Sequence, residues 1–263
     1  MSEDSVEELI DRNRHILSSP VRRDSYLSQV GRNSRSHRLL ANCTQGVYQR
    51  QVKFLSNLLV QTQGKPPHAI KILDWGCGRG HITYLLKKHG FNVTACDRDT
   101  RTDTNSAFQI DRPILSEQRI DVVPLQNDVE LPFRSSEFDC VVSFGVLEHV
   151  ANDLGSLKEI RRILKPHGLL YIVFLPYSLS WTQALARLAG DRYHDRLYWR
   201  RDVSGLAAAT GFRVRSVWFG QLLPKNPVPF AFDQFLEPID RAVCRFTPLR
   251  YFSTNLEVVM TPN

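Results

Sequence analysis

The sequence lacks any long hydrophobic run. Its longest apolar stretch, LLYIVFL at 169–175, has seven residues, whereas a membrane-spanning helix needs about 20. The first residues, MSEDSVEELIDRN, are too acidic for a secretory signal peptide. We therefore expect a cytoplasmic protein without a membrane span.

Cysteine is also scarce, with five residues in 263. These five lie far apart and form no C-x-x-C pair: Cys43, Cys77, Cys96, Cys140 and Cys244. The spacing excludes a disulfide framework and a cysteine-based zinc site. We expect no metal site.

The net charge is +7, with a pI near 9.3. Because the basic residues are scattered among acidic ones, a solvated surface is the first interpretation. The excess also leaves an anionic substrate or a peripheral contact with an anionic membrane open. The sequence does not indicate an oligomeric state.

The order of apolar segments predicts an α/β fold in one integrated domain. Residues 1–66 form a helical N-terminal extension, 67–221 a core of alternating strands and helices, and 222–263 a cap segment rich in Pro and Phe with a final strand. In the core we expect strands at 70–74, 92–96, 120–125, 138–143, 169–175 and 212–219, and helices at 79–89, 153–164, 180–189 and 202–210. Short apolar strands alternating with helices favour a doubly wound parallel sheet.

A glycine-rich turn follows the first expected strand, in ILDWGCGRGHIT at 72–83. Gly76, Gly78 and Gly80 lie where a doubly wound sheet opens its ligand crevice. Their spacing differs from the G-x-G-x-x-G of dinucleotide sites, which argues against NAD and FAD. Asp97 ends the next strand, where a carboxylate can accept hydrogen bonds from both hydroxyls of a ribose. The turn therefore predicts a ligand that carries a ribose.

Four segments in order, ILDWGCGRG, VTACD, LQNDVELPFRSSEFDCVVSFGVLEHV and EIRRILKPHGLLYIVFLP, resemble the motifs of class I S-adenosylmethionine-dependent methyltransferases. The likeness is to the small-molecule group and covers roughly residues 70–220. It implies S-adenosyl-L-methionine as cofactor and a Rossmann-like seven-stranded sheet whose last strand, NLEVVMTP, is antiparallel. One departure is KPHG where the family has KPGG, in a turn that tolerates it.

The resemblance also implies roles for individual residues. Gly76, Gly78 and Gly80 would face the methionine part of the cofactor, with Asp74 supporting their loop, and Asp97 would hold the ribose. Arg98 would lie beside the adenine, Asp128 would accept from its amino group, and the Val129 backbone would meet the ring. Phe144 and Gly145 would line the methionine side.

Two histidines are candidates for a catalytic base. His149 in LEHV follows the fourth strand, and His194 lies in a polar loop where the family builds its acceptor pocket. We expect His194 to reach the substrate proton and His149 to fix the methionine end of the cofactor. The alternative for His149 is that it only shapes the pocket.

The acceptor pocket is expected from aromatic residues after the fifth strand, Tyr177, Trp181, Tyr193 and Tyr198. The alternative is that they fill the seam between the sheet and the added helices. We also expect the segment Leu222 to Phe252 to cover this pocket or to form a contact surface.

The predicted function is O-methylation of a small molecule, with a sugar or glycoconjugate hydroxyl, including a lipid-linked glycan, as first choice. A phenol or quinone precursor is the second choice. A non-catalytic scaffold that binds S-adenosylmethionine is the alternative from another class. The D/N-P-P-Y motif of nucleic-acid amino-methyltransferases is replaced by GVLEH, which argues against nucleic acid as the acceptor.

Overall fold

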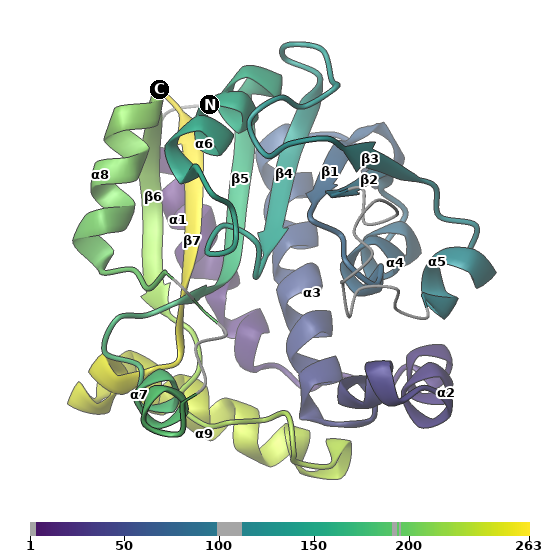
Figure 1. Cartoon of the computed structure of the whole chain (residues 1–263), viewed down its shortest axis with the longest axis vertical. Coiled ribbons are helices and arrows are strands. Elements are labelled where there is room, and N and C mark those ends of the chain that lie inside the picture. The colour runs from purple at the N-terminus through teal and green to yellow at the C-terminus, as the bar shows by residue number, and fades with distance from the viewer. Residues whose placement is uncertain (1–3, 99–111, 191–193, 195) are drawn as a thin grey trace.

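The computed structural model describes residues 4–98, 112–190, 194 and 196–263, and it is built around a seven-stranded sheet (Figure 1). The strand order is β3-β2-β1-β4-β5-β7-β6. The strands are β1 (Lys71–Trp75), β2 (Asn92–Arg98), β3 (Val122–Leu125), β4 (Phe138–Phe144), β5 (Leu164–Pro176), β6 (Phe212–Phe219) and β7 (Asn255–Pro262). Neighbouring strands from β3 to β5 pair in parallel, whereas β7 is antiparallel to both β5 and β6. The Rossmann-like fold with an antiparallel last strand is confirmed.

The middle of the sheet is buried on both faces. Strand β4, FDCVVSF, lies between β1 and β5 and is buried along its length up to Ser143. Because helices cover both faces of a parallel sheet, such a strand reads as a nearly continuous apolar run. This burial explains why the strands could be recognised from the sequence.

Helices cover the sheet in two layers (Figure 1). They are α1 (Asp4–Asn13), α2 (Ser25–Asn33), α3 (Cys43–Gln63), α4 (His81–Lys88), α5 (Pro113–Glu117), α6 (Asp153–Ile163), α7 (Trp181–Leu188), α8 (Arg200–Thr210) and α9 (Asp233–Phe246). One hydrophobic cluster joins the sheet to α1, α3 and α4, and a second joins it to α6 and α8. The two clusters form the core of the doubly wound arrangement.

Local signals set several helix ends. The Asn152 and Ser180 side chains accept from the backbone N–H groups of Gly155 and Gln183, which caps α6 and α7. Helix α8 stops at Gly211, whose φ of 76° belongs to the left-handed region, and β6 begins at the next residue. These signals agree with the boundaries expected from the sequence to within a few residues.

Helices α7 and α9 lie beyond the carboxyl ends of the parallel strands (Figure 1). The Trp181 indole N–H in α7 donates to the carbonyl of Leu222 at 2.8 Å, and the Leu222 N–H donates to Asp240 in α9 at 3.0 Å. The two helices are therefore neighbours at the end of the sheet where ligands bind in such folds. Among the described residues, no helix has the length and apolar character to cross a bilayer.

Candidate active site

The glycine-rich turn joins β1 to α4 in a left-handed backbone conformation. The φ angles of Gly76, Gly78 and Gly80 are 75°, 53° and 81°. A Cβ on Gly76 would lie 2.5 Å from Val146, and one on Gly80 would lie 2.4 Å from Leu115. At Gly78 a Cβ would meet nothing closer than 4.0 Å. The backbone at Gly78 is thus open to close approach by a ligand.

Asp97 binds this turn from the end of β2. One carboxylate oxygen accepts the Gly78 N–H at 2.8 Å, and the other accepts the Arg98 N–H at 2.8 Å. The Arg112 guanidinium lies 4.0 Å away. Because an ionised carboxylate has about four lone-pair sites, Asp97 keeps acceptor capacity for two hydroxyls. The turn and the carboxylate therefore fit the ribose end of an adenosine.

Asp74 lies beneath the turn and is buried in β1, 1% exposed. Its carboxyl accepts the Thr83 hydroxyl of α4 at 2.5 Å. Burial raises the pKa of Asp74 to about 7. This contact ties β1 to α4 across the turn, and the supporting role of Asp74 in cofactor binding stays a prediction.

Asp128 and Val129 follow β3, which pairs with the end of β2. The Asn127 side chain accepts the N–H groups of Val129, at 2.9 Å, and Glu130, at 2.8 Å. The Val129 N–H therefore already has a partner, so a bond from this N–H to adenine would have to share or replace Asn127. Asp128 is half-buried and lies in the same turn. Arg98 is exposed at the end of β2.

Phe144 ends β4 on the other side of the turn, and Gly145 follows it. Gly145 has a φ of 68° and donates its N–H to the Val173 carbonyl at 3.0 Å. A Cβ on Gly145 would lie 3.5 Å from Oε1 of Glu148. The Glu148 carboxylate therefore lies close to the end of β4, and the left-handed φ is what favours glycine at position 145.

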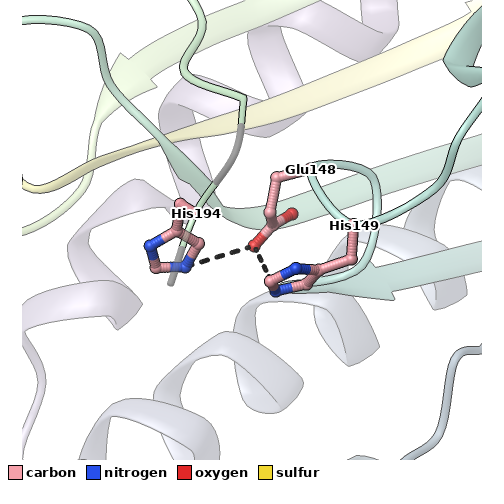
Figure 2. A group of neighbouring side chains, drawn as sticks. All are labelled: Glu148, His149 and His194. Atoms are coloured by element: carbon pink, nitrogen blue, oxygen red, sulfur yellow. Dashed lines mark ion pairs between the residues drawn. The ribbon is translucent and has the colours of Figure 1, made fainter. Parts of the chain in front are cut away.

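Glu148, His149 and His194 meet at this strand end. Figure 2 shows both imidazoles directed at the same carboxylate oxygen. Nε2 of each histidine lies 3.8 Å from Oε1 of Glu148, and the two rings stack with centroids 5.4 Å apart at 26°. The fold thus brings together the two histidines that the sequence proposed separately. The sequence analysis missed Glu148, although its place beside His149 in LEHV was a signal.

Burial controls the chemistry of Glu148. Its side chain is 2% exposed, against 37% for His149 and 20% for His194. Burial raises the pKa of Glu148 to about 7. The Gln183 amide lies 2.9 Å from Nδ1 of His194 and orients that ring. A carboxyl group that titrates near neutrality beside two imidazoles is suited to proton transfer.

The same three side chains are the one group, within the part of the chain that the structure describes, whose ligand atoms lie close enough to hold a metal ion, all within 4.8 Å of one another. Zinc binds nitrogen and oxygen ligands at about 2.0–2.2 Å. Tetrahedral ligand atoms at that distance from the ion lie roughly 3.4 Å from one another, so the 3.8 Å between each histidine nitrogen and Oε1 would have to shorten only slightly around an ion. The expectation that the chain has no metal site stays a prediction.

The segment that carries His194 is anchored to the loop that carries His149. The Tyr198 hydroxyl donates to the Leu147 carbonyl at 3.2 Å. The Arg196 guanidinium donates to the Val150 carbonyl at 3.2 Å and pairs with Asp153 at 3.1 Å. These contacts explain how residues 45 positions apart come to stack.

The aromatic residues expected in the acceptor pocket differ in how deeply they are buried. Tyr177 and Tyr198 are 4% and 2% exposed and face each other in a β-bridge. They occupy the seam between the sheet and the helices, which is the alternative that the sequence left open. Trp181 is half-buried at the start of α7, and Tyr193 lies outside the described residues.

Phe174 is a residue that no sequence signal indicated. It lies in β5, where the pairing with β7 is irregular between Ile172 and Leu175, and its φ is 64°. Its ring packs edge-on against Phe144, at 5.9 Å, and Tyr48, at 5.7 Å. A non-glycine residue held in this conformation is strained, and such residues cluster at functional sites. The three rings form an aromatic wall near the end of β4.

The sheet order, the glycine turn and the acidic end of β2 define the fold of class I methyltransferases. Residues 73–172 match the family described as a methyltransferase domain. This part of the chain therefore resembles a methyltransferase domain, and S-adenosylmethionine is the cofactor that the resemblance implies.

Proteins with similar sequences agree with this assignment. A ubiquinone biosynthesis O-methyltransferase of Caulobacter vibrioides is 29% identical over 128 residues, 48% of each chain. One of Rickettsia bellii is 34% identical over 127 residues, 43% of this chain and 50% of the relative. The chain thus spans about half the length of these curated relatives.

Solved structures share the fold at low sequence identity. A SAM-dependent methyltransferase of Archaeoglobus fulgidus is 17% identical with a TM-score of 0.50, covering 81% of this chain and 94% of that one. The PH0226 protein of Pyrococcus horikoshii is 18% identical with a TM-score of 0.50, covering 82% and 92%.

Proposed function

We propose that the protein transfers a methyl group from S-adenosylmethionine to a hydroxyl group of a small molecule. The observation that carries the proposal is the group of Glu148, His149 and His194 beside Gly145, at the edge of the cofactor turn. When bound, the cofactor supplies a methyl group that its sulfonium has already activated. The protein must hold the acceptor in line, exclude water and accept the hydroxyl proton.

His194 is the proposed proton acceptor. Its Nε2 faces Glu148, and the Gln183 amide contacts its other ring nitrogen. When the imidazole takes the hydroxyl proton, the Glu148 carboxylate beside it would stabilise the resulting positive charge. The structure places the Gln183 amide nitrogen against Nδ1. The proposed role requires the amide to be turned over, so that its oxygen faces Nδ1 and the imidazole hydrogen stays on Nδ1.

His149 is proposed to position the reactants. It follows directly after Glu148, in the turn that begins at Gly145, and its ring stacks on that of His194. Replacing it should therefore alter both cofactor binding and turnover, whereas replacing His194 should mainly lower turnover. The Asp74 carboxyl keeps its supporting role beneath the glycine turn.

A hydroxyl on an aromatic ring is the acceptor class that we favour. Phe144, Phe174 and Tyr48 give the end of β4 an aromatic wall, against which a flat ring can pack. The names of the relatives, ubiquinone biosynthesis O-methyltransferases, support the same class. A sugar or glycan hydroxyl, the first choice from the sequence, has no such observation in its favour.

Calorimetry with S-adenosylmethionine, its demethylated product and NAD tests the cofactor site. The wild type should bind the first two and not NAD. Asp97→Ala should weaken binding by about 1.5–3 kcal/mol for each hydrogen bond to the carboxylate that is lost. Asp121→Ala, which changes an exposed carboxylate at the start of β3, is the matched control. Tighter binding of NAD, or unchanged affinity in Asp97→Ala, would show that the site is wrongly placed.

Transfer of a labelled methyl group to a panel of acceptors tests the reaction. The panel pairs phenols and catechols with glycosides of similar size. Labelled phenol ethers are the expected product, and labelled sugars would instead support the glycan alternative. Cofactor binding without labelling of any acceptor, in the panel or in a metabolite extract, would favour the non-catalytic scaffold.

A further inference from the structure

Helix α9 is oriented with its acidic face inward. Asp233, Glu237 and Asp240 are at most 1% exposed, and Cys244 on the same face is 5% exposed. These positions recur at intervals of three and four residues, so they form one stripe along the helix. A surface helix normally buries its apolar face and exposes its charged one, and α9 does the reverse.

Buried cations hold the acidic face in place. Lys225 contacts Glu237 at 2.5 Å and Asp240 at 2.6 Å. Arg50 of α3 forms a bidentate pair with Asp233. Arg241 contacts Glu237 at 2.8 Å. If the helix were rotated to expose its acidic face, Lys225 and Arg50 would stay buried without their anionic partners. The network therefore fixes which face of α9 is outside.

The outward face of α9 is apolar. Phe235, Ile239 and Phe246 are 72%, 58% and 75% exposed. At 100° per residue they fall within about 40° of one another around the helix axis. The chain after α9 has three more exposed large apolar residues, Leu249, Tyr251 and Phe252. Monomeric proteins rarely leave a contiguous patch of large apolar side chains uncovered without an interaction site.

The exposed charged side chains of residues 221–263 are all basic. Every acidic side chain between residues 221 and 263 is buried: Asp233, Glu237, Asp240 and Glu257. Of the four basic residues there, Lys225 and Arg241 are used inside the network, whereas Arg245 is exposed and Arg250 half-exposed. The apolar face is therefore bordered by arginine without an exposed side-chain carboxylate of its own segment.

A groove beside α9 adds a further arginine. Arg14 and Trp218 line it from one side, and Arg245 and Phe246 line it from the other. The Arg14 guanidinium lies over the Trp218 ring at 5.2 Å, and its contact with exposed Asp11 is long, 3.9 Å. Burial and the nearby Arg245 lower the pKa of Arg14. Two arginines that repel each other across a groove favour an anion between them.

We propose that the outer face of α9 docks onto a lipid bilayer that contains anionic lipids. Phe235, Ile239 and Phe246 would enter the boundary between headgroups and acyl chains, and a lipid phosphate would lie in the groove between Arg14 and Arg245. The combination of a ridge of large apolar side chains with arginine is typical of helices that lie in the membrane interface. The exposed arginines that border the face favour an anionic bilayer over a second copy of the same face.

Vesicle flotation tests the proposal with the full chain. The probes are vesicles of phosphatidylcholine alone and vesicles in which phosphatidylglycerol replaces part of it. We expect binding to the mixed vesicles that weakens with salt. Phe235→Gln with Ile239→Gln should lower this binding about tenfold or more, and Arg245→Gln should lower it only for mixed vesicles. Leu154→Gln on α6 and Arg134→Gln are matched controls that change an exposed apolar and an exposed basic residue elsewhere.

Three outcomes would overturn the proposal. The first is no binding to mixed vesicles by the folded wild type, checked by its thermal unfolding. The second is equal loss in the α9 variants and their controls. The third is a wild-type dimer in solution that the Phe235 and Ile239 variant dissociates while vesicle binding is absent, which would assign the face to a second copy. Because the assay needs no methyl transfer, its result is independent of the proposed reaction.

Discussion

Two buried glutamates in this protein behave in opposite ways. Glu237 in α9 contacts Lys225 and Arg241, and although burial favours its neutral form, these cations and Arg50 lower its pKa to about 2. Glu148 is almost as buried but faces two imidazoles, and burial raises its pKa to about 7. The same residue type is a fixed anion in one place and a titrating group in the other.

The difference shows what the surroundings of a buried carboxyl group decide. Cations in contact stabilise the ionised form and make Glu237 part of a network that holds α9 in position. With no Lys or Arg of the described residues in contact, Glu148 exchanges its proton near neutral pH, as a proton-transfer group must. Burial alone therefore does not distinguish a structural charge from a catalytic one.

The largest expected effect tests the catalytic side of the comparison. Glu148→Gln keeps the size of the side chain but cannot stabilise a protonated histidine. We expect turnover of the labelled-methyl reaction to fall about 10²- to 10⁴-fold, while calorimetry shows nearly unchanged cofactor affinity. His194→Ala should show the same pattern, and His149→Ala a loss in both quantities.

Chelation provides the control for this prediction. Wild-type turnover should survive dialysis against a chelator, because the proposed role of the group is proton transfer. Loss of turnover on chelation, with recovery on adding zinc or cobalt, would instead make Glu148, His149 and His194 metal ligands. Normal turnover in both Glu148→Gln and His194→Ala would mean that catalysis rests on positioning alone.

The next effect tests the structural side. Glu237→Gln leaves Lys225 and Arg241 buried with one anion fewer, so we expect the free energy of unfolding to fall by about 3–5 kcal/mol. Urea unfolding followed by circular dichroism measures it. Glu159→Gln, which breaks a partly exposed pair with Arg162, is the matched control and should change stability by less than about 1 kcal/mol. Similar small changes in both variants would show that the network does not hold α9.

The smallest expected effect is the dependence of the free energy of unfolding on pH, which tests the difference between Glu148 and Glu237 directly. The folded-state pKa of Glu148, about 7, lies above its ordinary value of 4.5, so the folded protein holds this proton more tightly than the unfolded chain. The stability that this proton contributes is therefore lost as pH rises from about 4.5 to about 7, by at most about 3 kcal/mol.

Urea unfolding of Glu148→Gln and wild type at about pH 5 and pH 8 measures this linkage. Relative to wild type, the variant should gain stability at the higher pH, because it carries no carboxyl group to ionise. A variant that is equally destabilised at both values would place Glu148 among the structural charges, with Glu237. A variant that is less active but more stable at high pH would support the catalytic assignment.

The sequence predicted most of the fold because its strands and helices carry local signals. Strands β1 and β4 lie close to their expected ranges, whereas β5 begins at Leu164 rather than Leu169, and the turn with Gly76 and Gly78 is where the motif indicated. The site was predicted only in part. Tyr177 and Tyr198, proposed as substrate contacts, are buried in the seam between the sheet and the helices. The position of Phe174 depends on an irregularity in the pairing of β5 with β7, which no pattern of residues predicts.

By itself the sequence determined the fold class and the position of the cofactor turn, because a glycine turn, an acidic strand end and the alternation of strands and helices depend on neighbours along the chain. Only the tertiary structure decided the state of the buried charges. His194 stacks on His149, and Lys225 reaches Glu237, through contacts between segments that local patterns do not pair. The pKa of a carboxyl group depends on the distance to such partners and on burial, and both are properties of the folded chain.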